Sequence, residues 1–356
     1  MKYILHVGIC GFGNQLLGFK ETLMIAQKTG RSIILPHFIP HGTIKEQCQK
    51  YYNFETIFDK ENFKKYFNIL DIDYSNQNIL NEILKKNVKN IYFMRTKKDF
   101  YPSDYYYKLS KEIYELNHEY NEIRLNTKII KKDEDFNELR NINDDYLVII
   151  GTFNNIKLST CSKNGCVYCD YYNEFINEYN YSTKSLIHSN IIKKIAKFFL
   201  NQSNLKDYNG FHIRTPDNAE KTDYNFYKLY NNMHEKRVYD SILEYSNSQK
   251  INLPLVISIP PSGLKIKDIK IFNSDKVYRL SEFEDLFIYS IVELELLLNS
   301  KILIYSPSNT PYSKQSHQRS SFTLHIKELR KLYNIDNYDT NIYKIYKKIN
   351  YKHYSS

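Results

Sequence analysis

Three short clusters of glycine, amide, cationic and hydroxyl side chains have the clearest chemical potential in this chain. They are Gly11-Phe12-Gly13-Asn14-Gln15, His212-Ile213-Arg214-Thr215-Pro216-Asp217 and Arg319-Ser320-Ser321-Phe322-Thr323. Glycines let the backbone approach a ligand closely, and a helix start offers unpaired N–H groups to phosphate. A fixed arginine adds a permanent charge with a fork of donors that matches diphosphate oxygens. The clusters therefore predict a site for a nucleotide-sugar or a dinucleotide.

The first cluster lies between an expected strand and an expected helix. Lys2–Gly8 is strand-like, and Ser32–Leu35 is a short β-branched strand that Pro36 ends. Between them, apolar residues recur at helical spacing, namely Leu16, Phe19, Leu23 and Ala26. Gly30 is placed as the C-terminal stop of this helix. Asn14 and Gln15 are then expected at the N-terminus of the helix, where their amides face a sugar or diphosphate. The alternative is that Asn14 only caps the helix.

The second cluster follows a predicted strand over Gly210–Arg214, which Pro216 breaks. Arg214 is expected at the carboxyl end of a parallel strand, where ligands of α/β sheets bind. There it would stabilise the charge that develops on a departing nucleotide diphosphate. Asp217 would orient Arg214, accept a hydrogen bond from the donor sugar or act as a base; a plain structural salt bridge is the alternative.

The third cluster stands at the start of a predicted helix over Ser321–Leu332. Ser320 and Ser321 fit an N-cap, and with Arg319 they would form a cradle for a diphosphate. The alternative is an ordinary capped surface helix.

Strands and helices alternate along the whole chain, which predicts an α/β fold with parallel sheets. The further strands expected are Ile91–Met94, Tyr146–Thr152, Leu255–Ser258, Lys276–Arg279 and Lys301–Tyr305. The further helices expected are Ser189–Leu200, Asn225–Ser246 and Glu284–Leu298, and Tyr51–Phe67 is expected to be a helical or loop insertion. We take the polar stretch Asn201–Asn209 as the junction between two domains, residues 1–200 and residues 201–356.

Composition narrows the possible partners. The chain has 356 residues, of which 42% are hydrophobic and 25% charged, as expected for a globular protein. Its net charge of +10 is scattered among acidic residues, so no nucleic-acid-binding face is expected. We see neither a signal peptide nor an apolar run long enough to span a membrane, and we expect a cytoplasmic protein.

The five cysteines allow two interpretations. Cys161, Cys166 and Cys169 form a C-x4-C-x2-C cluster, which is one ligand short of a tetrahedral zinc site. We expect ordinary thiols in a polar loop, with a small zinc or redox-labile loop as the alternative.

The first cluster begins like the dinucleotide-binding motif G-x-G-x-x-G but departs from it twice. Leu16 stands where the third glycine belongs, and the second strand ends in Leu35-Pro36-His37 without the acidic residue that holds a ribose. Both departures disfavour an NAD-linked enzyme.

Taken together, the clusters resemble the protein O-fucosyltransferase family and its relatives in the wider fucosyltransferase superfamily. The resemblance rests on Gly11–Gln15 with the following helix and strand, on His212-Ile213-Arg214 with Asp217, and on Ser320–Thr323 before a helix that contains Arg330. The order and the flanking elements of the motifs agree with those of the family.

The resemblance implies a GT-B fold, in which two Rossmann-like domains face each other across a cleft. It implies inverting, metal-independent transfer of fucose from GDP-fucose to a hydroxyl of a protein or glycan acceptor, with no cofactor. The C-terminal domain would hold the donor and the N-terminal domain the acceptor. Arg214 and Asp217 would be catalytic, and the other expected donor-site residues are Gly11, Phe12, Gly13, Asn14, Gln15, His212, Arg319, Ser320, Ser321 and Phe322.

Two questions stay open at this stage. The base is Glu21, Asp217 or no residue at all. The alternative to a fucosyltransferase is a non-catalytic protein, or one that uses another nucleotide-sugar, with the same fold.

Overall fold

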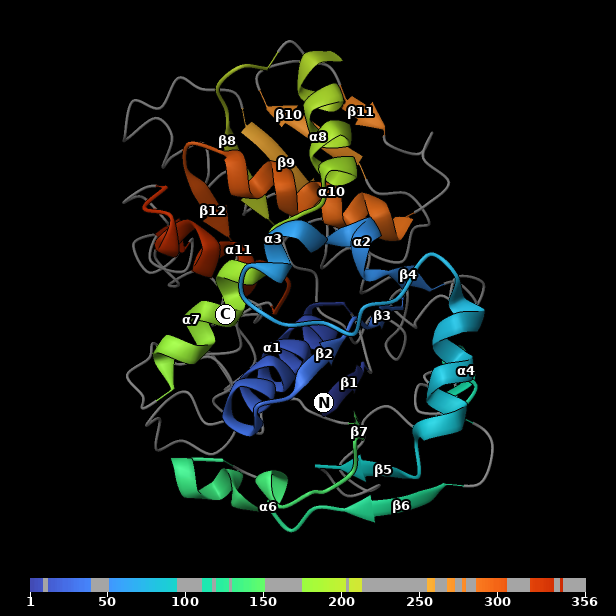
Figure 1. Cartoon of the computed structure of the whole chain (residues 1–356). Coiled ribbons are helices and arrows are strands. Elements are labelled where there is room, and N and C mark those ends of the chain that lie inside the picture. Colours follow the sequence, from blue (N-terminus) through green and yellow to red (C-terminus); the bar gives the residue numbers. More distant parts are fainter. Residues whose placement is uncertain are drawn as a thin grey trace, which may run out of the picture. The chain divides into compact units, whose positions relative to one another are not determined.

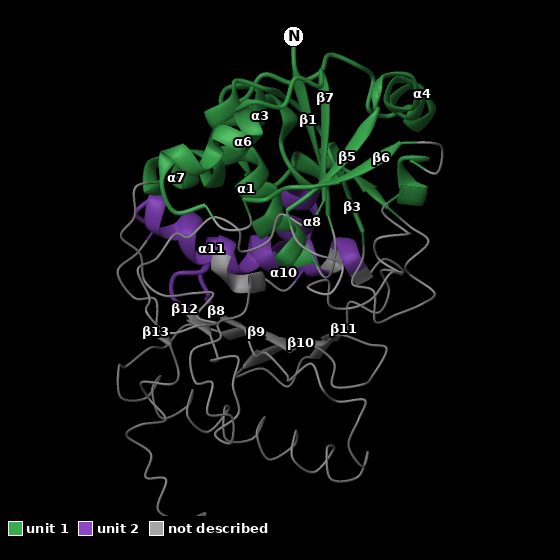
Figure 2. Ribbon diagram, turned by 90° about the horizontal axis from the view of Figure 1, so that it is seen from below, with its two compact units in different colours: residues 1–191 green, residues 192–356 purple. Residues whose placement is uncertain are grey.

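The computed structural model describes residues 1–8, 12–39, 51–94, 111–116, 120–127, 130–150, 175–202, 205–212, 255–259, 268–272, 277–279, 286–305, 321–335 and 340–341. The chain divides into two compact units, Met1–Ile191 and Ile192–Ser356 (Figure 2). Each unit is described by itself below.

The N-terminal unit is built on a sheet of five parallel strands (Figure 1). They are β1 (Tyr3–Val7), β2 (Ser32–Ile34), β5 (Asn90–Phe93), β6 (Asn121–Arg124) and β7 (Tyr146–Ile150), in the order β2-β1-β7-β5-β6. Tyr3 of β1 pairs with Ser32 on one side and with Tyr146 on the other. The four residues Leu147–Ile150 are all buried, as the continuous apolar run of β7 predicted.

The described residues of this unit also form helices and a short antiparallel pair of strands. The helices are α1 (Phe12–Thr29), α2 (Phe54–Ile57), α3 (Lys60–Lys64), α4 (Gln77–Asn87), η3 (Asp133–Phe136), α6 (Asn137–Arg140) and α7 (Ile176–Ser185). The antiparallel pair consists of β3 (His37–Phe38) and β4 (Tyr52–Asn53). The predicted insertion at Tyr51–Phe67 thus contains β4, α2 and α3.

Helix α1 is the central helix of the N-terminal unit. It is buried from Gln15 to Ala26, and aromatic rings surround Phe19, with those of Phe38, Phe54 and Phe63 about 6 Å away from it. The helix ends as predicted at Gly30, whose φ of 65° is the left-handed conformation that favours glycine. A helix buried on nearly every side holds its first turn in a fixed place relative to the sheet.

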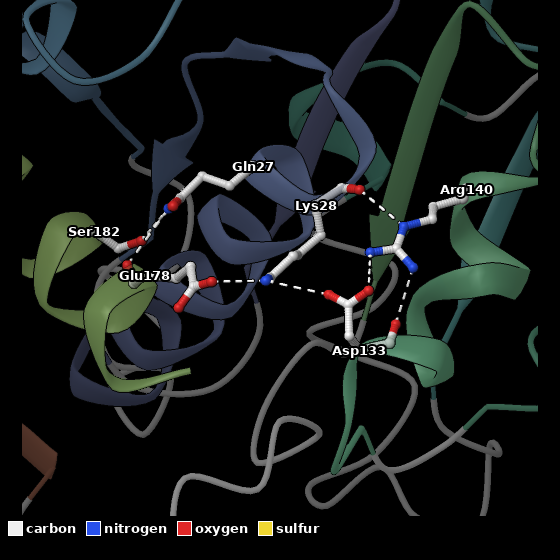
Figure 3. A network of polar contacts seen from close by, with 6 residues as sticks. All are labelled: Gln27, Lys28, Asp133, Arg140, Glu178 and Ser182. Atoms are coloured by element: carbon white, nitrogen blue, oxygen red, sulfur yellow. Dashed lines mark hydrogen bonds and ion pairs between the residues drawn. The ribbon is translucent and has the colours of Figure 1, made fainter. Parts of the chain in front are cut away.

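A network of charged side chains fastens the other end of α1 (Figure 3). Lys28 Nζ lies 2.6 Å from Glu178 Oε1 of α7 and 3.2 Å from Asp133 Oδ1 of η3. Arg140 of α6 reaches the other oxygen of Asp133 at 2.7 Å and donates through Nε to the carbonyl of Lys28. Hydrogen bonds with Glu178 and Asp133 raise the pKa of Lys28. The cation also suits its position, because the end of a helix carries partial negative charge.

The C-terminal unit contains a mixed sheet of six strands in the order β11-β10-β9-β8-β12-β13. Its strands are β8 (Asn209–His212), β9 (Leu255–Ile259), β10 (Asp268–Phe272), β11 (Val277–Arg279), β12 (Leu303–Tyr305) and β13 (Thr340–Asn341). The described helices are α8 (Asn190–Gln202), which crosses the boundary between the units, α10 (Leu286–Asn299) and α11 (Ser321–Leu332).

The expectation of purely parallel sheets is wrong for this unit. Strands β9, β8, β12 and β13 run parallel, but β10 is antiparallel to both β9 and β11. Only residues 260–267 separate β9 from β10. A parallel crossover needs a dozen or more residues, so this connection permits only an antiparallel neighbour.

Most predicted elements are confirmed within the described residues. The predicted helix over Asn225–Ser246 lies outside them. No described helix is both long enough and apolar enough to cross a lipid bilayer.

Candidate functional site

The carboxyl edge of the N-terminal sheet has a close approach between the end of β1 and the start of α1. A Cβ atom on Gly8 would lie 3.0 Å from Gln15 Cγ and 3.2 Å from Gln15 Oε1. Any other residue at Gly8 would push against the first turn of α1. The turn itself includes Gly11, which lies outside the described residues.

Gln15 fastens a second segment to this edge. Its Nε2 donates to the carbonyl oxygen of Ile39 at 2.8 Å, and its Oε1 accepts from the Ile39 N–H at 3.0 Å. The side chain is buried. The carboxamide thus makes with Ile39 the same two backbone hydrogen bonds that a residue of a neighbouring strand would make. Gln15 therefore positions the chain that follows β3.

The other described residues of the first cluster differ in exposure. Phe12 is buried, with its ring edge-on to Phe38 and stacked on Phe58, so its side chain belongs to the core. Gly13 and Asn14 are half-buried in the first turn of α1. Asn14 is the third residue of the helix, and the alternative that it serves as the N-cap is therefore wrong.

Glu21 does not lie at this edge. It is nine residues into α1, about 14 Å along the axis from Phe12, and its side chain is only 1% exposed. This position and this burial disfavour Glu21 among the possible bases.

Two buried histidines lie on or just after the strands that form the edge, and no motif in the sequence singled them out. Burial lowers the pKa of His6, in β1, to about 3 and that of His37, just after β2, to about 4. Both rings are therefore neutral near pH 7. The ring of His37 stacks on Tyr114 with centroids 5.4 Å apart, and the backbone N–H of His37 donates to the Tyr114 hydroxyl at 2.7 Å.

In the C-terminal unit, the second cluster follows the carboxyl end of β8. His212 is the last residue of this strand and pairs with Ser258 of β9 and Tyr305 of β12. Strand β8 thus has a parallel neighbour on each side at this point, as the prediction for Arg214 requires. Arg214 and Asp217 lie outside the described residues, and for His212 only the backbone is described.

Gly210 allows the end of α10 to approach β8. A Cβ on this glycine would lie 2.7 Å from Ser300 Oγ, 2.9 Å from Ser300 Cβ and 3.0 Å from Leu297 Cδ2. The Gly210 N–H donates to the Ile302 carbonyl, and the Lys301 N–H donates to the Tyr208 carbonyl. The strand that leads to Arg214 is therefore held directly by the chain that leaves α10.

The third cluster forms the start of α11. This helix runs from Ser321 to Leu332, as predicted from the sequence. Arg319 and Ser320 lie outside the described residues, and for Ser321 and Phe322 the structure describes only the backbone. A helix start at Ser321 orients the first backbone N–H groups of α11 away from the rest of the helix, as anion binding requires.

Arg330 joins α11 to the end of α10, which the sequence did not reveal. Its guanidinium is buried and donates to the carbonyls of Leu297, Leu298, Ser300 and Lys301 at 2.7–3.2 Å. These are carbonyls at and beyond the C-terminus of α10, where helical partners are missing. Ser300 Oγ also accepts from Arg330 and donates to Leu297. One side chain therefore fixes α10, α11 and the approach to β12 together.

The residues that the structure describes contain no group of three or more histidine, cysteine or acidic side chains suited to a metal ion. The cluster Cys161, Cys166 and Cys169 lies outside those residues.

Comparison with known proteins identifies the family. Residues 3–253 match the sequence profile of the family described as GDP-fucose protein O-fucosyltransferase. The chain belongs to this family. The match spans the first two clusters and ends before the third, and it makes the chain a glycosyltransferase of the fucosyltransferase type. None of the curated protein sequences matches the chain.

Solved structures share the fold of this family member. POFUT1 in its apo form is 14% identical, with a TM-score of 0.58, over 96% of this chain and 97% of POFUT1. POFUT1 in complex with GDP-fucose gives the same values, and its complex with GDP has a TM-score of 0.56 at 14% identity. The likeness covers both units and confirms an α/β fold with a parallel sheet.

Proposed function

We propose that the chain transfers fucose from GDP-fucose to a hydroxyl group of a protein or glycan acceptor, with inversion and without a metal ion. The observation that carries the proposal is the family match over residues 3–253, which includes Gly11–Gln15 and His212–Asp217. Strand β8, which ends at His212, and helix α11, which begins at Ser321, support the proposal because the second cluster follows the one and the third cluster leads into the other.

The proposed architecture is GT-B, with residues 1–200 on the acceptor side and residues 201–356 on the donor side. Each unit has parallel strands whose carboxyl ends lead into expected site segments. Gly13 and Asn14 would lie near the fucose and the diphosphate. The GDP moiety would be held by His212, Arg319, Ser320, Ser321 and Phe322.

The reaction breaks the bond between the anomeric carbon of fucose and the diphosphate oxygen, and forms a bond from that carbon to the acceptor oxygen. GDP leaves with the bonding electrons, and the attack comes from the opposite face of the sugar. Arg214 would neutralise the developing charge on GDP, which replaces the usual task of a divalent ion. The proton of the acceptor hydroxyl passes to Asp217, or to water if no residue serves as base.

Replacement of Arg214 tests this assignment. Arg214→Lys keeps the charge but loses the bidentate hydrogen bonding to the diphosphate, and we expect turnover to fall about 100-fold or more. Release of GDP from GDP-fucose, with water as acceptor, measures turnover without a known acceptor. Arg124, exposed on β6, provides the matched control Arg124→Lys. Near-normal turnover in folded Arg214→Lys would refute the role of Arg214, and turnover absent even in the unaltered chain would favour the non-catalytic alternative.

A further inference from the structure

Helix α8 has two apolar side chains on its uncovered side. Its buried residues are Ile192, Ala196 and Phe199. Ile191 and Phe198, by contrast, are 55% and 56% exposed. They are seven residues apart, so they lie two turns apart along one line of the helix surface. The buried face fixes the helix, which holds both exposed side chains in place.

Lysines border this apolar line. Lys194 is three residues after Ile191 and four before Phe198, so it neighbours both on the helix surface. Lys194 and Lys197 are exposed, and Lys193 is half-buried. Helix α8 contains no acidic residue, and none of these three lysines forms an ion pair with a described carboxylate. Among the residues that the structure describes, the face is thus apolar and its lysines have no ion-pair partner.

Charge decides which partner fits this face. A second copy of the chain would bring lysines against lysines, and each copy carries a net charge of +10. A partner must therefore be anionic, and it must also accept two protruding apolar side chains. The interface of an anionic lipid bilayer does both, because apolar side chains enter the acyl boundary while lysines remain among the headgroups.

We propose that the α8 face, defined by Ile191, Lys194, Lys197 and Phe198, docks on an anionic lipid surface. Each lysine near such a surface contributes about five-fold in partition, which corresponds to ~1 kcal/mol. Truncation of the half-exposed Phe198 removes roughly another five-fold. The proposal does not depend on the transferase activity, and it concerns where the chain resides rather than what it transfers.

Co-sedimentation with vesicles tests the proposal. The full chain is mixed with phosphatidylcholine vesicles that contain about one third phosphatidylserine, and with pure phosphatidylcholine vesicles. The test variants are Lys194→Ala/Lys197→Ala and Phe198→Ala. The matched control is Lys85→Ala/Lys86→Ala, which removes the same charge from exposed positions of α4.

The expected result is binding to the anionic vesicles only, about 25-fold weaker for the double lysine variant and about five-fold weaker for Phe198→Ala. The control variant is expected to lose at most a small fraction of the binding. Equal loss in the control would overturn the proposal, because net charge alone would then account for binding. Absence of vesicle binding together with binding to polyglutamate would overturn it as well and would assign the face to an acidic protein.

Discussion

Replacing Arg330 tests how the C-terminal unit holds its donor-side elements in place. Arg330→Met keeps a long side chain of helix-forming type but removes all guanidinium donors. The carbonyls of Leu297, Leu298, Ser300 and Lys301 then lose the bond from Arg330, and Leu297 keeps only that from Ser300 Oγ. The change leaves α11 intact as a helix and removes only the hydrogen bonds that join it to the end of α10.

The expected cost follows from these acceptors. Lys301 is an exposed residue, so water replaces the lost bond there. The other three carbonyls bond to Arg330 in buried positions. The Leu297 carbonyl keeps the bond from Ser300 Oγ, so two buried carbonyls are left unsatisfied. At the low end of ~1–3 kcal/mol for each such group, the loss is about 2 kcal/mol. Arg330→Lys should cost less, since an ammonium group retains the charge at the end of α10 and up to three donors.

Urea unfolding followed by far-ultraviolet circular dichroism measures this loss. The method suits a chain without tryptophan. Lys331→Met is the matched control, because Lys331 is the next residue of α11 and is exposed; it should change the free energy of unfolding by less than about 0.5 kcal/mol. A loss below about 1 kcal/mol for Arg330→Met, or one equal to the control, would refute the reasoning that Arg330 holds the end of α10.

Three other substitutions probe the scaffold. Gly210→Ala places a Cβ 2.7 Å from Ser300 Oγ and should cost about 1–3 kcal/mol in a thermal melt, whereas an unchanged midpoint would mean that β8 and α10 lie farther apart. Gln15→Leu removes both hydrogen bonds to Ile39 and should lower the free energy of unfolding by about 2 kcal/mol. Hydrogen exchange at the Ile39 amide should become faster, and unchanged protection would contradict the conclusion that Gln15 holds Ile39. Burial lowers the pKa of His37 from 6.5 to about 4, so the unfolded chain binds a proton that the folded chain rejects. The contribution of His37 to the free energy of unfolding therefore falls by about 1.4 kcal/mol per pH unit as the pH drops from 6.5 to about 4. In His37→Gln, the slope of the free energy of unfolding against pH should be smaller by the equivalent of one proton. Equal slopes in urea titrations of the two proteins would argue against a buried neutral ring.

Local patterns in the sequence predicted the elements that depend on local chemistry. The serines before an apolar period of 3.6 predicted the start of α11 at Ser321, and Gly30 predicted the end of α1. Strand β10 was missed although Asp268–Phe272 alternates polar and apolar residues, the signal of a strand with one covered face. The short connection over residues 260–267 would also have indicated its antiparallel direction.

Contacts between distant residues were beyond reach of the sequence. Gln15 was predicted to face a ligand, but its carboxamide bonds to Ile39, and no pattern shows which backbone group an amide will meet. Arg330 and Lys331 are adjacent cations in the last turn of α11, and only packing buries the first and exposes the second. Glu21 was considered as a base because of its type, and the sequence did not reveal that its side chain is buried within α1.

Calorimetric titration with nucleotides tests whether the chain is a metal-independent GDP-fucose transferase. The full chain is titrated with GDP-fucose, GDP, GDP-mannose, UDP and NAD, first without added metal and then with EDTA. We expect tight binding of GDP and GDP-fucose that EDTA does not change, and little heat with UDP or NAD. Preference for UDP or NAD, silence toward every GDP compound, or binding that EDTA abolishes would contradict a metal-independent GDP-fucose transferase.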